Sequence, residues 1–182
     1  MSDAYDLVVI GGGPAGACAA EVFAQEPNIE TVMFERKMDN CKPCGGAIPL
    51  CMVDEFKLPT EIIDRKVRKM KMISPSNREV DIGQTLEPNE YIGMTRREVL
   101  DAYLRDRAVG YGAKPINGLV TEVELPSTPD GKYRISYSNY AGDKRMGVPE
   151  ELEADVLGKC EVPAWEVGRA RRQMVCTRKS HR

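Results

Sequence analysis

The pattern of apolar and polar positions predicts a strand, a helix and a second strand near the start of the chain. Tyr5–Ile10 is a short apolar run, rich in β-branched residues and bounded by glycine, which is typical of a buried parallel strand. Pro14–Gln25 predicts a helix of small residues, with proline in the first turn, where a missing N–H costs nothing. Thr31–Glu35 predicts the second strand. Together these segments predict one right-handed βαβ unit.

The clearest helical pattern comes later, at Thr95–Val109. Apolar residues recur there three and four positions apart, as one face of a helix requires. This stripe consists of Val99, Leu100, Tyr103, Leu104 and Ala108. Asp101 and Arg105 add an acid–base pair four residues apart.

Short alternating runs elsewhere predict further strands. Residues 119–125 and 133–138 predict a hairpin or meander, and Leu152–Leu157 predicts another strand. Residues 66–73 predict an exposed or edge strand, whereas the Cys-, Gly- and Pro-rich residues 39–49 predict an irregular loop.

Composition indicates a globular protein, because 42% of the 182 residues are hydrophobic and 30% are charged. A formal net charge of -2 gives no reason to expect nucleic acid as a partner. The longest uncharged stretch, Leu7–Ala20, is interrupted by glycines and Pro14 and is too short to span a bilayer. We see no secretory signal or transit segment before the first strand, so we expect reduced cysteines rather than a disulfide framework.

The end of the chain differs from the rest. Residues 157–182 contain seven basic and two acidic residues, and hydrophobic periodicity disappears there. We therefore expect one domain over residues 1–156 and a divergent, disordered basic tail over residues 157–182.

A glycine fingerprint joins the first predicted strand to the first predicted helix. Gly11, Gly13 and Gly16 form G-x-G-x-x-G, in which the first glycine allows a tight turn and the second lets backbone N–H groups approach a pyrophosphate. The third allows close packing of helix and sheet. A pyrophosphate would lie at the helix N-terminus, where free N–H groups and the helix dipole favour negative charge. An unrelated glycine-rich turn is the alternative.

Glu35 ends the second predicted strand and is placed to accept hydrogen bonds from a ribose diol. Its charge disfavours the 2′-phosphate of NADP, although Arg36 beside it weakens that argument. The fingerprint itself does not separate FAD from NAD. The candidate nucleotide-binding residues at this stage are Gly11, Gly12, Gly13, Pro14, Ala15, Gly16, Glu35 and Arg36.

Longer motifs carry a family resemblance that covers about Tyr5 to Val156. Cys41–Leu50 (CKPCGGAIPL), Tyr91–Leu104 (YIGMTRREVLDAYL) and Ile62–Asn77 (IIDRKVRKMKMISPSN) resemble the plant, algal and cyanobacterial geranylgeranyl reductases of chlorophyll and tocopherol synthesis. The resemblance implies an α/β fold: an FAD-binding Rossmann-like βαβ domain with inserted antiparallel strands, incomplete at its C-terminus. It also implies that NADPH reduces the bound FAD without a separate nicotinamide domain.

The resemblance implies further site residues. Arg97 matches the arginine that reaches the FAD phosphates, although without the family it would be interpreted as a solvated arginine at a helix end. Cys44, Gly45 and Gly46 match a loop near the flavin, and Val120 completes the candidate cofactor-binding set.

Cys44 is the candidate catalytic residue, as a proton donor to the reduced alkene or as a packing residue beside it. Cys41 and Cys44 could instead form half of a zinc site or a redox pair, but no second cysteine pair has suitable spacing. We therefore expect no metal. His181 is the only histidine, which argues against Ser-His-Asp and Cys-His catalysis.

The implied activity is reduction of geranylgeranyl diphosphate or geranylgeranyl-chlorophyll to phytyl products. The implied location is the chloroplast or the cyanobacterial cytoplasm or thylakoid surface, with peripheral thylakoid association. The basic run between Arg65 and Lys71 could meet a substrate diphosphate or an anionic membrane, but such a run is more often the solvated face of a strand.

The sequence departs from the family after Val156. An acidic-glycine motif would continue the strand in the family, but the chain continues Leu157–Pro163 (LGKCEVP). We interpret residues 157–182 as a non-native continuation, such as a frameshift or intron read-through. A genuine basic tail that binds an anionic partner is the alternative. Two other functions stay open: a flavin monooxygenase-like enzyme and a non-catalytic fragment.

Overall fold

The computed structural model describes residues 3–39, 44–141 and 147–159. The chain divides into two compact units. The first unit is formed by Met1–Cys41 together with Asp101–Arg182, and the second unit is Lys42–Leu100.

The first unit begins with the predicted βαβ arrangement. Strand β1 (Asp3–Ile10) is followed by helix α1 (Pro14–Ala24) and strand β2 (Thr31–Glu35), and the two strands pair in parallel. The predicted bounds of β2 are confirmed, and α1 ends one residue before the predicted Gln25. The glycine fingerprint therefore lies at the carboxyl end of β1, where α/β proteins bind their ligands.

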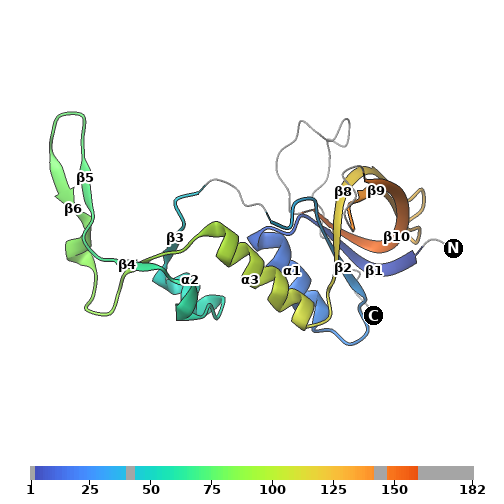
Figure 1. Cartoon of the computed structure of the whole chain (residues 1–182), viewed down its shortest axis with the longest axis horizontal. Helices are drawn as coiled ribbons and strands as arrows, with labels where there is room; N and C mark the ends of the chain where they lie inside the picture. The colour runs from blue at the N-terminus through green and yellow to red at the C-terminus, as the bar shows by residue number, and fades with distance from the viewer. Residues whose placement is uncertain (1–2, 40–43, 142–146, 160–182) are drawn as a thin grey trace. The chain divides into compact units, whose positions relative to one another are not determined.

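Three further strands complete this sheet and curve away from it, as Figure 1 shows. They are β8 (Lys114–Glu124), β9 (Tyr133–Asn139) and β10 (Val148–Lys159). The start of β8 pairs in parallel with β2, and its later residues pair antiparallel with β9. Strand β10 pairs antiparallel with β9 and in parallel with β1, so the five strands close into a barrel in the order β1-β10-β9-β8-β2.

This arrangement confirms the predicted hairpin and the predicted mixture of parallel and antiparallel strands. The strand predicted at Leu152–Leu157 is longer than expected at both ends. Its last residues, Leu157 to Lys159, pair with Val8 to Ile10. Residues 160–182, the greater part of the predicted tail, lie outside the described residues.

Strands β1 and β2 are buried on both faces along most of their length, which explains why their sequences are continuous apolar runs. Because side chains alternate along a strand, one set faces the meander β8–β10 and the other faces the helices. Phe34 belongs to the first set, and its ring meets Tyr137 edge-on with centroids 4.8 Å apart. The meander-facing cluster consists of Val8, Ile10, Val32, Phe34, Ile135, Tyr137, Leu152 and Ala154.

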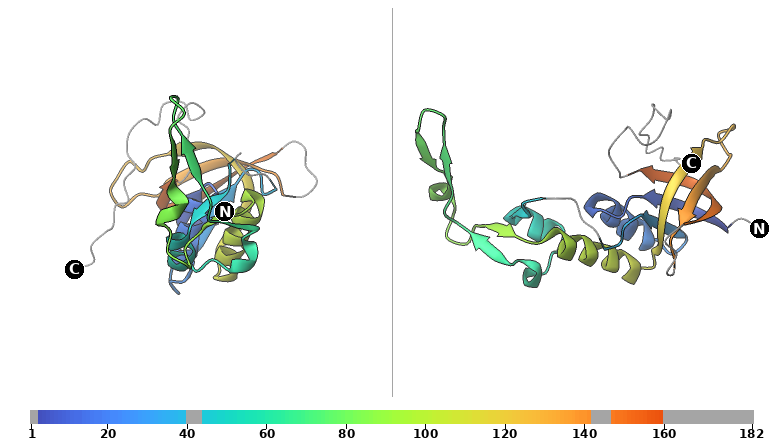
Figure 2. Two further views of the ribbon diagram at one scale, coloured as in Figure 1. Left: turned by 90° about the vertical axis from the view of Figure 1, so that its left-hand side faces the viewer. Right: turned by 45° about the horizontal axis from the view of Figure 1, so that its top comes forward.

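Helix α3 (Arg97–Gly110) crosses the boundary between the two units, and its part from Asp101 onward lies beside α1 in the first unit. Figure 2 shows these two helices on one side of the strands, with the meander on the other. The predicted stripe is buried at Leu100, Leu104 and Ala108. A 2.6 Å ion pair between Arg107 and Glu21 joins α3 to α1.

The second unit contains only short strands. Strands β3 (Ala47–Pro49) and β4 (Arg65–Val67) flank β7 (Ile92–Met94) in an antiparallel sheet, and β5 (Lys71–Ile73) pairs with β6 (Glu79–Asp81). The remaining elements are helix α2 (Leu50–Glu55) and the 3-10 turns η1 (Thr60–Ile62) and η2 (Ile82–Thr85).

Two predictions for the second unit are wrong. The loop predicted over residues 39–49 ends in strand β3, because Ala47–Pro49 finds a pairing partner in β7. The single strand predicted over residues 66–73 is two strands in different sheets, β4 and β5. Between them the side chain of Arg68 donates to the carbonyl oxygens of Pro88 and Glu90.

No helix in the described part of the chain is both long enough and apolar enough to cross a membrane.

Candidate dinucleotide site

The glycine turn has the conformation that its sequence requires. Gly11 has a φ of +104°, a region that residues with a Cβ rarely adopt, and its N–H donates to the carbonyl of Phe34 at 2.9 Å. Gly13 caps α1 in an extended conformation, and Pro14 occupies the first turn. No side chain in the described residues caps this helix start, so its first N–H groups are available to a ligand.

Gly12 and Gly13 have opposite surroundings. A Cβ on Gly12 would lie 2.8 Å from the Cβ of Glu35 and 3.1 Å from the Cδ of Arg105. A Cβ on Gly13 would meet nothing within 4 Å among the described residues. Gly12 therefore allows close packing behind the turn, while Gly13 faces open space where a phosphate could approach. Gly16 is buried in α1.

Glu35 lies against this turn. One carboxylate oxygen accepts from the N–H of Gly12 and the other from the N–H of Lys37, each at 3.0 Å. With its nitrogen turned toward β2, the side-chain amide of Asn117 also donates to the main-chain oxygens of Glu35 and Arg36, both at 3.2 Å. The end of β2 is thus fixed, with a carboxylate beside the start of α1.

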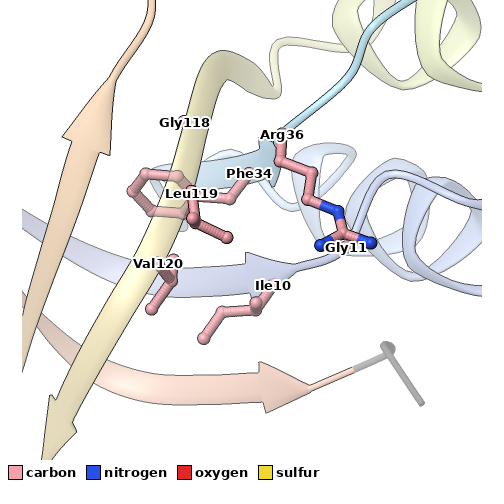
Figure 3. A pocket seen from close by; sticks show the side chains of 7 residues that line it. All are labelled: Ile10, Gly11, Phe34, Arg36, Gly118, Leu119 and Val120. Carbon is pink, nitrogen blue, oxygen red and sulfur yellow. The ribbon is translucent and has the colours of Figure 1, made fainter. Parts of the chain in front are cut away.

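A small pocket adjoins the carboxyl ends of β1 and β2 (Figure 3). Strand β8 supplies its third wall at the point where that strand leaves the parallel sheet and enters the meander. The side chain of Arg36 reaches across toward Gly11, as Figure 3 shows. Of the predicted site residues, the pocket therefore brings together Gly11, Arg36 and Val120, and its complete lining is Ile10, Gly11, Phe34, Arg36, Gly118, Leu119 and Val120.

Arg105 is a site residue that the sequence prediction missed. Only 7% of it is exposed, and its guanidinium donates to the carbonyl of Gly12 at 3.1 Å and to that of Met38 at 2.7 Å. Asp101, its predicted pair partner, is also buried, at 3% exposure. The available signal was an acid–base pair directly beside a buried apolar stripe, a position where charged residues are rarely found without a structural reason.

Of the remaining predicted site residues, Ala15 is exposed in the first turn of α1, and Cys44, Gly45, Gly46 and Arg97 belong to the second unit. Cys44 and Gly45 are exposed, and the N–H of Gly46 donates to the sulfur of Cys44 at 3.5 Å. Gly46 has a φ of +72°, and its carbonyl accepts from the N–H of Thr95 at 2.9 Å, just before Arg97 opens α3. This loop and the start of α3 are thus held together. Arg97 and the glycine turn lie in different units, so contact of Arg97 with the phosphates stays a prediction.

The hypothesis of a zinc or redox pair at Cys41 and Cys44 falls partly on residues 40–43, which lie outside the described residues. Among the described residues, no cluster of three His, Cys, Asp or Glu side chains could hold a metal ion.

The pKa values of Cys18 in α1 and Arg107 in α3 are both raised, for different reasons. Burial raises the pKa of the Cys18 thiol, and Arg107 opposes this rise. Burial by itself would lower the pKa of Arg107, but hydrogen bonds with Glu21 and Tyr103 outweigh it, so the pKa lies above the ordinary value. Arg107 is therefore a fixed cation of the α1–α3 contact.

Solved structures identify the class of fold. The chain superposes on a geranylgeranyl bacteriochlorophyll reductase-like protein from Thermoplasma acidophilum with a TM-score of 0.69 and 20% identity, covering 86% of this chain and 39% of that one. A myxobacterial chondrochloren halogenase, described as a variant of FAD-dependent halogenases, gives 0.67 and 19% over 86% and 37%. The fold is that of the FAD-binding, Rossmann-type oxidoreductases, as predicted.

Sequence relatives identify the family, although no family model matches the chain. A protein of Nicotiana tabacum named chloroplastic geranylgeranyl diphosphate reductase is 63% identical over 157 residues, which cover 83% of this chain and 32% of the relative. A geranylgeranyl diphosphate reductase of Synechocystis is 58% identical, over 83% and 37%. The chain belongs to the geranylgeranyl diphosphate reductase family, which confirms the resemblance, and it spans about a third of the length of these relatives.

Proposed function

We propose that the first unit binds the ADP portion of FAD within a geranylgeranyl reductase. The observation that carries this proposal is the carboxylate of Glu35 at the N–H of Gly12, beside a helix start with open space in front of Gly13. A carboxylate suits a ribose diol, and a helix N-terminus suits a diphosphate.

The surroundings fit the three parts of an ADP group. The half-buried side chains of Leu119 and Val120 would lie against adenine, and Glu35 would accept from the ribose hydroxyls. The N–H groups at Gly13 and the first turn of α1 would receive the phosphates, assisted by Arg97. Because Glu35 repels a 2′-phosphate, this site disfavours NADPH, which would act as a reductant that binds elsewhere. The choice of FAD over NAD rests on the family resemblance.

Bound FAD, once reduced by NADPH, would supply the hydride that saturates an isoprenoid double bond. The second alkene carbon then needs a proton, for which the exposed Cys44 thiol is the candidate donor. In purified enzyme, Cys44→Ser should lower turnover, whereas Cys51→Ser, which changes another exposed cysteine, should not. Normal turnover by Cys44→Ser would remove Cys44 from the mechanism.

The names of the relatives support geranylgeranyl diphosphate and a chloroplast or cyanobacterial location, whereas geranylgeranyl-chlorophyll and thylakoid contact rest on the predicted resemblance. We propose geranylgeranyl diphosphate or geranylgeranyl-chlorophyll as the substrate, and a chloroplast or cyanobacterial location with peripheral thylakoid contact. A non-catalytic nucleotide-binding fragment is the second candidate, because the chain spans only about a third of these relatives. Flavin binding without NADPH-dependent product formation would identify that candidate.

Direct titration tests the proposed site. The purified chain should bind FAD and ADP, and should bind NADP⁺ more weakly because of its 2′-phosphate. Glu35→Gln should weaken ADP binding about tenfold, since a hydrogen bond to a charged group contributes roughly 1.5–3 kcal/mol. Glu26→Gln, at an exposed site, is the control. Equal affinity of the wild type and Glu35→Gln for ADP would contradict the proposed role of Glu35.

A further inference from the structure

A buried cation lies directly against the glycine turn. Arg105 comes from α3, 93 residues away from Gly12 in sequence, and is 7% exposed. A buried charge is costly unless its hydrogen-bonding groups are satisfied. Two main-chain oxygens, those of Gly12 and Met38, accept from the two terminal nitrogens of its guanidinium.

The bond to Gly12 determines the direction of the next N–H group. The Gly12–Gly13 peptide is planar and trans, so its C=O and N–H point in opposite directions. Because the carbonyl of Gly12 points to Arg105, the N–H of Gly13 points away from Arg105. A Cβ on Gly13 would meet no described atom within 4 Å, so the backbone of this residue is not enclosed on its Cβ side.

The bond to Met38 ties the segment after β2 to the same guanidinium. Met38 follows Glu35 by three residues, and Arg105 donates to its carbonyl at 2.7 Å. The carboxylate of Glu35 in turn accepts from the N–H of Gly12. Arg105 therefore holds the turn and the segment after β2 at a set separation, and a rigid guanidinium fork suits such a double contact better than an ammonium does.

We propose that Arg105 is a positioning residue for the diphosphate of the bound nucleotide. It orients the N–H of Gly13 toward the phosphates and supplies a positive charge on the far side of the same peptide. The inference rests on the proposed function, because it assumes an ADP group at this turn.

Arg107 provides a matched comparison on the same helix. Its side chain is also largely buried, at 17% exposure, and it forms a 2.6 Å ion pair with Glu21 in α1. Loss of either arginine leaves buried polar groups without a donor, so both changes should lower stability. Only the Arg105 change should alter recognition of phosphate.

The test compares affinities for ADP and adenosine in the full chain, measured by calorimetry or NMR titration. Adenosine lacks the phosphates, so the ratio of the two dissociation constants isolates phosphate recognition from general loss of structure. Arg105→Met should reduce the preference for ADP about tenfold or more, while Arg107→Met should keep the wild-type ratio. Should Arg105→Met not fold, Arg105→Lys replaces it and should reduce the preference about threefold or more, because an ammonium cannot span both carbonyls.

An unchanged ratio in a folded Arg105 variant would overturn the inference and leave the proposed function intact. A wild-type chain that binds ADP no better than adenosine would overturn the proposed function itself. Glu35→Gln adds a third comparison, because loss of the ribose contact should weaken adenosine and ADP by similar factors.

Discussion

The two units differ in how much of their apolar surface they bury themselves. In the first unit, Val8 and Val32 in the central strands are 0% exposed, because the meander covers one face and the helices cover the other. In the second unit, Met72 and Ile73 of β5 are each 62% exposed, and Val80 of β6 is 59% exposed. The candidate nucleotide site thus stands on rigid, fully packed strands, whereas the β5–β6 hairpin has little core of its own.

Strand length explains much of this difference. β1 and β10 run for 8 and 12 residues and pair on both edges, so each ordered residue gains cross-strand and face-to-face contacts. The strands of the second unit are three residues long. Burying one large apolar side chain contributes about 1.5–3 kcal/mol, and the β5–β6 hairpin gains little of this.

The largest expected effect is at Gly46, on which the second unit depends for its backbone path. Gly46→Ala would place a Cβ 1.8 Å from the carbonyl oxygen of Thr95, at a φ of +72°. The clashing atom belongs to the main chain of Thr95, and alanine is strained at this φ. We therefore expect the free energy of unfolding of this unit to fall by at least about 2 kcal/mol. Urea denaturation followed by hydrogen exchange at β3 and β7 measures it.

Gly45→Ala is the control for this substitution, because a Cβ there would meet no described atom within 4 Å. It should change stability by less than about 0.5 kcal/mol. Comparable losses for the two variants would mean that the close contact between Gly46 and Thr95 does not constrain the unit.

The same contrast separates what the sequence predicts from what it does not. The βαβ unit was predictable because its strands, turn and helix are contiguous, and each carries its own signal over five or more residues. The three-residue strands β3, β4 and β5 are too short for alternation to be read, and β3 pairs with β7 far along the chain. The number of residues over which a hydrophobic pattern extends therefore decided which of these strands could be predicted.

Arg105 and Gly12 show the corresponding limit for the site. The fingerprint and Glu35 follow from local spacing, but the contacts of Arg105 with Gly12 and Met38 join segments 93 and 67 residues apart. The crowding of Gly12 by Glu35 and Arg105 likewise exists only in the folded chain. Hydrophobic periodicity predicted the helix that carries Arg105, but it did not predict that this side chain contacts the main chain at Gly12 and Met38.

A graded effect of another kind should appear in native-state hydrogen exchange. Amides of the β5–β6 pairing, such as those of Met72 and Val80, should exchange at least about a hundredfold faster than those of Val8 and Val32. Their hairpin can open without unfolding a core, whereas β1 and β2 open only with the whole barrel. Equal protection of the amides in both units would contradict this prediction. It would mean that the hairpin is more stable than the exposed side chains of Met72, Ile73 and Val80 imply.

The smallest expected effect compares cysteine thiols of the two units. Burial raises the pKa of Cys18 in α1, with Glu21 adding to the rise and Arg107 opposing it, so a smaller share of this thiol is thiolate at a given pH. Since the thiolate is the nucleophile, iodoacetamide at pH 8 should label Cys18 more slowly than the exposed Cys44 and Cys51, roughly tenfold, as followed by peptide mass spectrometry. The gap should narrow when denaturant is added, because unfolding removes the burial that raises the pKa. If Cys18 reacted as fast as Cys51 in the native chain, α1 would be opening readily, and the packed helix layer beneath the nucleotide site would be far less rigid than the buried strands imply.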